Sequence, residues 1–377
     1  METPFAFGKI VSGKEFTDRE KETDKLINNF KSGINTIILS PRRWGKSSLV
    51  AKAAKSTTEN NPHVKFCFID LYNVRDEAEF YNHYVQSIIK STSSKTGEVF
   101  DTVKKFMGKF IPKISFGTDP INEFSIKLDW NEVIRDPDDI LDLPEKISKY
   151  KNIRLVICLN EFQNIGEFKQ PVYFQKKLRA HWQKHQKVSY CIYGSKKHMM
   201  LQVFSNPSLP FYKFGEIMFL NKIEINDWEK FIIKRFKDTK KEIDKETAEL
   251  IASMVDCHSY YIQQLAQQCW LRTDKKCTKA IAENALEDLI NQFDFLFQTI
   301  TESLTLNQIN FLKALINGVK QFSSKQTIDE YSLGTSASVN RTKKTLYEKE
   351  IIDTDVNGIT ILDPVYKLWL KRIYLSE

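Results

Sequence analysis

The sequence of 377 residues lacks several features that mark secreted and membrane proteins. It has only six cysteines, and they form no Cys-x-x-Cys pair. Cys158 and Cys191 stand in apolar segments with the pattern of core strands, so a reducing compartment fits best. No apolar run approaches the roughly 20 residues that cross a bilayer, and the start shows no apolar signal-peptide segment. We therefore expect a cytoplasmic protein without membrane contact.

Glycine and proline are almost missing between residues 226 and 299, which indicates a helical segment. Over the whole chain, 41% of the residues are hydrophobic and 12% are aromatic, which argues against disorder and permits real cores. The formal charge of +8 permits nucleic-acid or phosphate partners without requiring them. The length corresponds to two or three domains.

One short motif carries the strongest functional signal. A turn follows the apolar residues 36–39 and reads Ser40-Pro41-Arg42-Arg43-Trp44-Gly45-Lys46-Ser47. A strand, a tight turn and Gly-Lys-Ser at the start of a helix are the layout of a phosphate-binding P-loop. Ser40 stands where this motif has its first glycine. The alternative interpretation is therefore an ordinary basic turn before a helix.

The P-loop interpretation assigns a role to each residue of the turn. We expect Lys46 to reach the β- and γ-phosphates of ATP and the Ser47 hydroxyl to ligate Mg²⁺. The turn aims backbone N–H groups at the phosphates, and the helix N-terminus adds partial positive charge. The expected nucleotide-binding residues are Ser40, Arg42, Arg43, Trp44, Gly45, Lys46, Ser47 and Ser48.

A second segment has the pattern of the catalytic half of such a site. Residues 154–159 read as a buried parallel strand, and Asn160 and Glu161 follow it. An acidic pair at this place holds the Mg²⁺ shell with its first residue and polarises the attacking water with its second. We therefore expect Asn160 in the metal position and Glu161 as the catalytic base. Asp70 and Ser195 also end expected strands, where ligands of parallel sheets bind.

Asn160 removes one negative charge from beside the expected dication. At an effective dielectric constant of about 20, a unit charge about 4 Å away is worth about 4 kcal/mol before solvent screening. We therefore expect ATP binding with weakened use of Mg²⁺ and slow hydrolysis. Three interpretations stay open: a natural slow ATPase, a relative that only binds nucleotide, and a deliberately altered chain. Asn160→Asp should raise ATP turnover if this position is interpreted correctly.

Strands that alternate with helices over residues 1–222 predict a three-layer α/β core with a parallel sheet. Residues 93–150 look like an insertion within it, with a hairpin between residues 113 and 128. We expect a helical lid over residues 223–300. Residues 301–377 contain three helices and a hairpin, the parts of a winged helix-turn-helix. The predicted fold is α/β, a P-loop NTPase core with a helical lid and a C-terminal winged helix.

The expected elements have the following bounds. The core strands are residues 35–40, 64–70, 154–159, 189–195 and 217–220. The core helices are residues 17–31, 47–55, 76–89 and 171–186, and Thr17 and Glu20 are expected to form a capping box at the start of the first. The winged helix has helices at residues 306–317, 324–331 and 335–349 and a hairpin that turns at Asn357-Gly358.

With these segments in place, the chain resembles the prokaryotic archaeal-type ATPase family within the broader AAA+/STAND group. The resemblance spans nearly the whole chain, and its motifs are Phe16-Thr17-Asp18-Arg19-Glu20-Lys21-Glu22, the P-loop with Arg42-Arg43, Asn160-Glu161-Phe162-Gln163, Tyr193-Gly194-Ser195, Cys257-His258-Ser259-Tyr260-Tyr261-Ile262-Gln263, Ser338-Val339-Asn340-Arg341 and Asp363-Pro364-Val365-Tyr366. It implies an ATP-binding core, a lid and a winged helix. It also implies that Ser195 reads the γ-phosphate, as a third catalytic residue beside Lys46 and Glu161, and that His258 faces the nucleotide.

The resemblance leaves the partner open, because its members are associated with mobile elements, defence and DNA-linked regulation. A winged helix either contacts duplex DNA or packs against protein. The residues expected to contact DNA lie on the third helix of this domain and are Ser338, Asn340, Arg341 and Lys344. A nucleotide-dependent oligomer is also open. Lys213 stands near the place where relatives carry an arginine, so an arginine finger is unsupported.

Two further patterns have plain structural interpretations. His181 and His185 lie four residues apart on an expected helix, as in metal sites, but no third ligand is evident. We interpret them as a solvated or partly packed helix face. Arg235 is expected to form a surface ion pair.

Overall fold

The structure is a computed structural model that describes residues 3–107, 113–116, 124–127, 137–355 and 358–375. Backbone contacts divide the chain into two compact units. We call Arg19–Asn221 the sheet unit, and Met1–Asp18 together with Lys222–Glu377 the helical unit. Each unit is described by itself.

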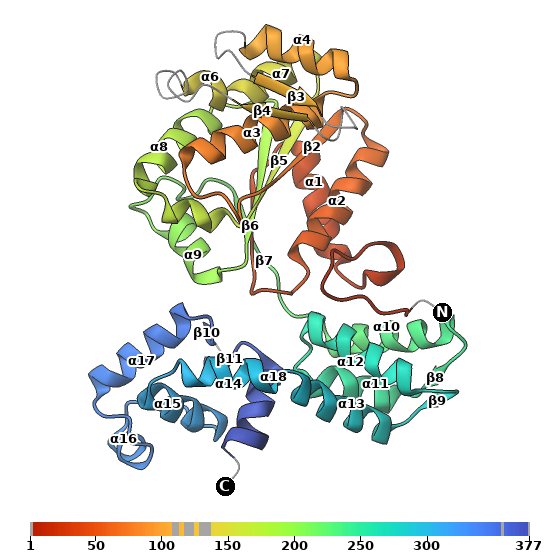
Figure 1. The fold of residues 1–377 in the computed structure, drawn as a ribbon, viewed down its shortest axis with the longest axis vertical. Coiled ribbons are helices and arrows are strands. Elements are labelled where there is room, and N and C mark those ends of the chain that lie inside the picture. The colour runs from red at the N-terminus through yellow and green to blue at the C-terminus, as the bar shows by residue number, and fades with distance from the viewer. Residues whose placement is uncertain (1–2, 108–112, 117–123, 128–136, 356–357, 376–377) are drawn as a thin grey trace. The chain divides into compact units, whose positions relative to one another are not determined.

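A five-stranded parallel sheet forms the centre of the sheet unit (Figure 1). Its strands are β1 (Thr36–Leu39), β2 (Val64–Asp70), β5 (Arg154–Asn160), β6 (Val188–Gly194) and β7 (Glu216–Phe219), in the order β2-β5-β6-β1-β7. All neighbouring strands of this sheet pair in parallel. The predicted parallel sheet and its five strands are confirmed.

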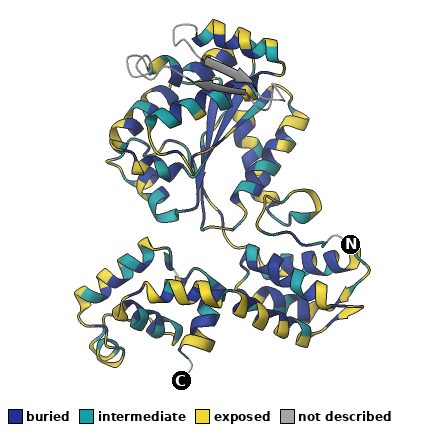
Figure 2. Cartoon of the chain, viewed as in Figure 1, coloured by how far each residue is buried: buried dark blue, intermediate teal, exposed yellow. Residues whose placement is uncertain are grey.

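Helices cover both faces of this sheet, which explains why its central strands are apolar throughout. The α1 helix (Glu20–Ser32) and the α2 helix (Lys46–Asn60) lie on one face, while α3 (Glu77–Thr92), α8 (Pro171–Trp182) and α9 (Lys197–Ser205) lie on the other (Figure 1). The strands β1 and β6 are buried along their whole length (Figure 2).

All four predicted core helices have different ends in the structure. The helix predicted at residues 47–55 spans Lys46–Asn60, and the one predicted at residues 76–89 spans Glu77–Thr92. The first core helix begins at Glu20 instead of Thr17, and the expected capping box is wrong. Arg19 precedes it in the left-handed conformation (φ 71°) and donates a hydrogen bond to the carbonyl of Asn221 at 2.6 Å. The α8 helix ends at Trp182, because the chain turns there to enter β6.

The predicted insertion contains α4 (Thr96–Met107), the antiparallel pair β3 (Lys113–Phe116) and β4 (Phe124–Lys127), α6 (Asp138–Leu141) and α7 (Leu143–Lys151). The predicted hairpin is thus confirmed, although its connection lies outside the described residues. No helix in the described parts of the chain is both long and apolar enough to cross a bilayer.

His181 of α8 and His185, which follows the end of this helix, are both largely buried. His181 is 9% exposed, and its Nδ1 lies 2.8 Å from the carboxylate of Asp142. His185 Nε2 lies 3.3 Å from the same carboxylate, and Tyr190 OH lies 2.8 Å from His185 Nδ1. Of the two expected alternatives, the solvated face is wrong and the packed one agrees with the structure. Among the described residues, no group of three His, Cys, Asp or Glu side chains is arranged to hold a metal ion.

The helical unit begins with a bundle, as the shortage of glycine and proline predicts. Its helices are α10 (Ile225–Asp238), α11 (Lys245–Met254), α12 (Ser259–Arg272), α13 (Lys279–Gln292) and α14 (Asp294–Glu302), and two short parallel strands, β8 (Glu242–Ile243) and β9 (Lys276–Cys277), pair beside them. Arg235 is 5% exposed and pairs with Asp238, so the predicted ion pair forms but is not on the surface.

The end of the helical unit has the predicted winged-helix elements. They are α15 (Leu306–Ile316), α16 (Lys325–Glu330), α17 (Ser336–Glu348), the antiparallel strands β10 (Ile352–Asp355) and β11 (Gly358–Ile361), α18 (Pro364–Trp369) and the π-helical turn η4 (Leu370–Tyr374). Val339, Thr342 and Leu346 are buried on the inner face of α17.

The first residues of the chain belong to the helical unit, whereas the sequence predicts residues 1–222 as one core. Phe5 is 1% exposed and packs against Phe231 and Phe236, with ring centroids 6.1 and 5.8 Å apart. The short 3₁₀ turn η1 (Gly13–Glu15) follows, and Gln263 donates a hydrogen bond to the carbonyl of Glu15 at 3.2 Å. This packing is long-range, so local patterns do not reveal it.

Candidate functional site

The loop between β1 and α2 has the backbone shape of a P-loop. Arg43 (φ 63°) and Gly45 (φ 91°) both adopt positive φ, and the α2 helix starts at the next residue, Lys46. The first bond within the helix runs from the N–H of Leu49 to the carbonyl of Gly45 at 2.9 Å. Glycine adopts this conformation at little cost, whereas most other residues are strained by it.

Lys46 is 6% exposed and lies folded over the loop. Its ammonium group donates to the carbonyls of Ser40 at 3.0 Å and Pro41 at 2.7 Å, and it lies 3.2 Å from the Ser40 hydroxyl. The two carbonyl oxygens are neutral acceptors. A phosphate oxygen would make a stronger, charge-assisted bond with the same group.

The loop has room for a phosphate group. A Cβ atom built on Gly45 meets no heavy atom within 4 Å, so the space above this residue is open. The N–H groups of the first helical turn point out of the N-terminus and create positive potential there. Ser47 stands in this first turn and is only partly buried, so its hydroxyl fits the role of a magnesium ligand. These features fit a magnesium–nucleotide complex.

The ends of three neighbouring strands meet beside this loop, because the strand register aligns them. Asp70 of β2 lies opposite Asn160 of β5, and Asn160 lies opposite Tyr193 of β6. Gly194, the last residue of β6, lies opposite Leu39, which immediately precedes the P-loop. The sheet therefore brings these polar strand ends to one edge, as predicted from the sequence.

Asn160 has a direct partner on the neighbouring strand. Its amide nitrogen Nδ2 donates to Asp70 Oδ1 at 3.1 Å, and the same oxygen accepts the N–H of Tyr72 at 3.1 Å. A carboxylate only accepts hydrogen bonds, so the amide presents its nitrogen to Asp70. The carbonyl oxygen Oδ1 of Asn160 is left available as an acceptor. A carboxylate on the adjacent strand thus lies within hydrogen-bond distance of the amide at residue 160.

Glu161 adopts the left-handed conformation (φ 53°), which is uncommon for a residue with a side chain. Its Oε2 accepts bonds from the Ser195 hydroxyl at 2.8 Å, from the Ser195 N–H at 3.2 Å and from Gln163 Nε2 at 2.5 Å. The predicted base and the predicted sensor are therefore in direct contact. Gln163, which is 1% exposed, holds the carboxylate from the other side.

Burial raises the pKa of the Tyr193 phenol well above its usual value, and Cys158 and Cys191 raise it further. The phenol beside Asn160 therefore stays neutral, which adds no negative charge to this edge of the sheet. Tyr193 and Gln163 are not among the site residues expected from the sequence. Tyr193 stands two residues before Ser195 and Gln163 two residues after Glu161, and this spacing is the signal that could have pointed to them.

The remaining predicted residues belong to the helical unit. His258 is 6% exposed and packs against the ring of Tyr261, with centroids 5.0 Å apart. Its role toward a nucleotide stays a prediction. On α17, Asn340, Arg341 and Lys344 are exposed. Ser338 is half-buried, and its hydroxyl lies 3.1 Å from that of Thr335 at the helix N-cap.

Residues 295–372 match the family model described as "Probable winged helix domain". Among curated proteins, nucleolar protein 58 of Kluyveromyces lactis is 25% identical over 109 residues, 29% of this chain and 21% of that protein. The chain thus covers about a fifth of this relative's length. So short a match carries no argument about function.

Three solved structures are similar over almost the whole chain. A Walker-type ATPase of Pyrococcus abyssi has a TM-score of 0.65 at 17% identity and covers 98% of this chain and 100% of its own. The ORC2 protein of Aeropyrum pernix, in ADPNP–ADP complexes, has a TM-score of 0.58 at 14% identity, with 99% and 98% covered. The ORC1 protein of the same organism, in complex with DNA, has a TM-score of 0.50 at 10% identity, with 99% and 98% covered.

These comparisons and the topology define the class of fold. The chain has the fold of an AAA+ P-loop ATPase followed by a C-terminal winged helix domain. More particularly, its fold is that of the archaeal ORC and Walker-type ATPases named above.

Proposed function

We propose that the chain is an ATP-binding P-loop ATPase that works as a nucleotide-controlled switch. The observation that carries the proposal is the buried Lys46 ammonium at the N-terminus of α2, beside a sheet edge that presents Glu161 and Ser195. Fold similarity to Walker-type ATPases supports the same class. Nucleotide binding closes the lid, helices α10–α14, on the sheet unit and moves the winged helix toward a partner.

Each residue of the site has a task in ATP hydrolysis. Lys46 leaves the Ser40 and Pro41 carbonyls and binds phosphate oxygens, and the N–H groups of the first α2 turn bind the same groups. Glu161 takes the proton of the attacking water. Ser195 turns its hydroxyl from Glu161 toward the γ-phosphate. The Glu161 carboxylate therefore loses this hydrogen bond, and is free to act as the base, only when that phosphate is present.

Magnesium, when bound, neutralises the charge of the phosphates. Ser47 provides one hydroxyl ligand, and the Oδ1 of Asn160 accepts a bond from metal-bound water. Asp70 fixes the direction of that oxygen through its bond with the amide. Because Asn160 is neutral, we expect Mg²⁺ to raise the affinity for ATP less than it would with an aspartate at this position. We also expect hydrolysis to be slow.

ATP binding and phosphate release test this proposal. We expect Lys46→Ala to abolish ATP binding, because the P-loop loses its cation, and Lys55→Ala, an exposed position on the same helix, to have no effect. We expect Glu161→Gln to keep ATP binding and to stop steady phosphate release. Equal ATP affinity of the wild type and Lys46→Ala would refute the proposed site.

The second candidate is a module that binds nucleotide without hydrolysing it. The neutral amide of Asn160 at the expected metal position favours this alternative. Both candidates predict loss of ATP binding with Lys46→Ala. Only the ATPase predicts phosphate release that Glu161→Gln removes, so this one comparison separates them.

We propose that the winged helix contacts duplex DNA through α17. Its exposed Asn340, Arg341 and Lys344 support this, as does the fold shared with an ORC1 protein solved with DNA. Each phosphate contact should change the slope of log affinity against log salt by about 0.9. Arg341→Glu should weaken binding and lower this slope, whereas Lys320→Glu, an exposed residue outside α17, should change neither. Binding that does not respond to salt would exclude DNA and favour a protein partner.

A further inference from the structure

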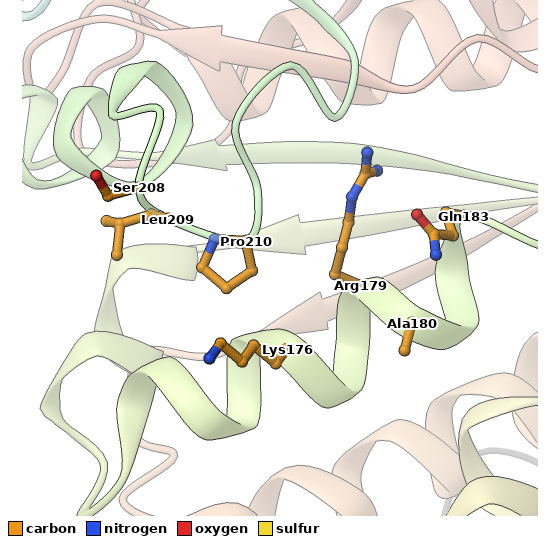
Figure 3. A pocket seen from close by; sticks show the side chains of 7 residues that line it. All are labelled: Lys176, Arg179, Ala180, Gln183, Ser208, Leu209 and Pro210. Carbon is orange, nitrogen blue, oxygen red and sulfur yellow. The ribbon is translucent and has the colours of Figure 1, made fainter.

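The sheet unit has a pocket that the proposed ATP site does not use. Its volume is about 360 Å³, and its lining residues are Lys176, Arg179, Ala180, Gln183, Ser208, Leu209 and Pro210 (Figure 3). None of these residues belongs to the P-loop or to the strand ends that form the nucleotide site. The pocket therefore needs an explanation of its own.

One wall of the pocket is a single face of α8. Lys176, Arg179, Ala180 and Gln183 follow the i, i+3, i+4, i+7 spacing that places side chains on one side of a helix. Figure 3 shows the Arg179 and Gln183 side chains extending from this helix beside each other. The face carries two cations and one amide.

The opposite wall is a loop that successive turns hold in place. The N–H groups of Ser208 and Leu209 donate to the side chain and the carbonyl of Asn206, each at 3.0 Å. The N–H of Tyr212 then donates to the carbonyl of Leu209 at 3.1 Å. This wall is therefore formed before any ligand binds, so less conformational entropy is lost on binding.

Arg179 is held in position by an aromatic side chain. Its guanidinium carbon lies 4.8 Å from the ring centroid of Phe214, which is 5% exposed. Partial burial lowers the pKa of the Arg179 guanidinium. A guanidinium stacked on a rigid ring has its donor fork oriented in advance.

Neither cation of the pocket has an acidic partner in the described part of the chain. No carboxylate forms a salt bridge with Lys176 or Arg179 there, and the lining contains no acidic residue. The neighbouring Lys177 differs, because its ammonium lies 3.2 Å from the carboxylate of Glu77. The unpaired positive charge is thus concentrated on the face that lines the pocket.

We propose that this pocket binds a small phosphate-bearing molecule of mononucleotide size. The Arg179 guanidinium binds two phosphate oxygens in a bidentate manner. The Lys176 side chain extends in another direction from the same helix (Figure 3), so its ammonium adds a charged contact elsewhere on the ligand. Leu209 and Pro210 form an apolar surface for the rest of the ligand. The volume lies in the range of about 300–1,000 Å³ that is typical of small-molecule sites and exceeds the need of an inorganic phosphate ion.

The test measures binding of AMP and of inorganic phosphate to the Lys46→Ala chain, in which the P-loop no longer competes. We expect saturable AMP binding that is tighter than that of phosphate. Arg179→Gln should weaken AMP binding by about tenfold or more, since each tenfold step corresponds to the loss of about one charge-assisted bond. Lys176→Gln, at an exposed position that the fold does not need, should weaken it about threefold.

Lys177→Gln is the matched control, because it removes a paired lysine one residue away from the pocket. It should leave AMP binding unchanged. The proposal is overturned if AMP shows no saturable binding, if phosphate binds as tightly as AMP, or if Lys176→Gln and Arg179→Gln both bind AMP like the parent chain. Since all chains carry Lys46→Ala, these results do not depend on the proposed ATPase activity.

Discussion

Replacing Asn160 by aspartate should destabilise the nucleotide-free protein, although it restores the usual acidic motif. The amide of Asn160 donates to Asp70 at 3.1 Å, and Asn160→Asp removes this donor and places two carboxylates side by side. At an effective dielectric constant of about 20, two like charges about 4 Å apart repel by about 4 kcal/mol. Asp70 is exposed, so solvent and salt reduce this repulsion considerably. The lost hydrogen bond adds about 1 kcal/mol.

We therefore expect Asn160→Asp to lower the free energy of unfolding of the sheet unit by about 1–3 kcal/mol at pH 7 without magnesium. Urea unfolding with and without Mg²⁺ measures this difference. Like-charge repulsion raises the pKa of one carboxyl above its unfolded value of about 3.9, so the penalty exists above the raised pKa and disappears as the pH falls toward 4. Binding of magnesium–ATP should remove much of this loss of stability. Asn160→Asp should also turn over ATP faster than the wild type.

The exchanged pair provides a matched control. Asp70→Asn together with Asn160→Asp restores one amide and one carboxylate across the two strands, so most of the lost stability should return. Asp70→Asn alone should cost less than Asn160→Asp, because no charges are brought together. If Asn160→Asp is as stable as the wild type at low salt and pH 7, the contact between residues 70 and 160 does not have the energy assigned to it.

The remaining predictions concern buried groups outside the site. Burial lowers the pKa of His185, while the bond with Asp142 acts in the opposite direction, so neutral His185 is favoured in the folded state. The sheet unit should therefore lose stability as the pH falls from about 7 to 5. His185→Gln should make the unfolding temperature depend less on pH over this range. If the variant and the wild type show the same pH dependence, the role assigned to His185 is wrong. Phe5→Ala should lower the free energy of unfolding of the helical unit, measured in urea, by about 3–5 kcal/mol, because Phe5 is 1% exposed. Ile10→Ala should change this free energy by less than about 0.5 kcal/mol, because Ile10 is 62% exposed. Similar effects of the two substitutions would show that the N-terminal segment is not part of that core.

The sequence predicts the strands of the sheet well, because each one is a short apolar run bounded by polar or turn residues. The predicted strand at residues 64–70 has the same bounds in the structure, and the other four differ by one residue or fewer at each end. The P-loop was also predictable, since Gly45, Lys46 and Ser47 need only a strand before them and a helix after them. These features depend on residues that are close in sequence.

Helix ends and side-chain partners were harder to predict. Thr17 has the spacing of an N-cap, but Arg19 reaches Asn221, about 200 residues away, and this contact fixes where α1 begins. The spacing of His181 and His185 is compatible with a solvated or a partly packed face, and only the contact of both rings with Asp142, the N-cap residue of α7, decides between them. In both cases a contact from a distant segment outweighs a local preference.

The sequence by itself determined the order of strands and helices, the P-loop, and the presence of Glu161 and Ser195 at strand ends, because local patterns encode these features. Only the tertiary structure decided that Asp70 holds Asn160, that Ser195 and Gln163 hold Glu161, and that Phe5 packs into the helical unit. The physical reason is strand register and long-range packing, which join residues whose separation in the chain leaves no local pattern.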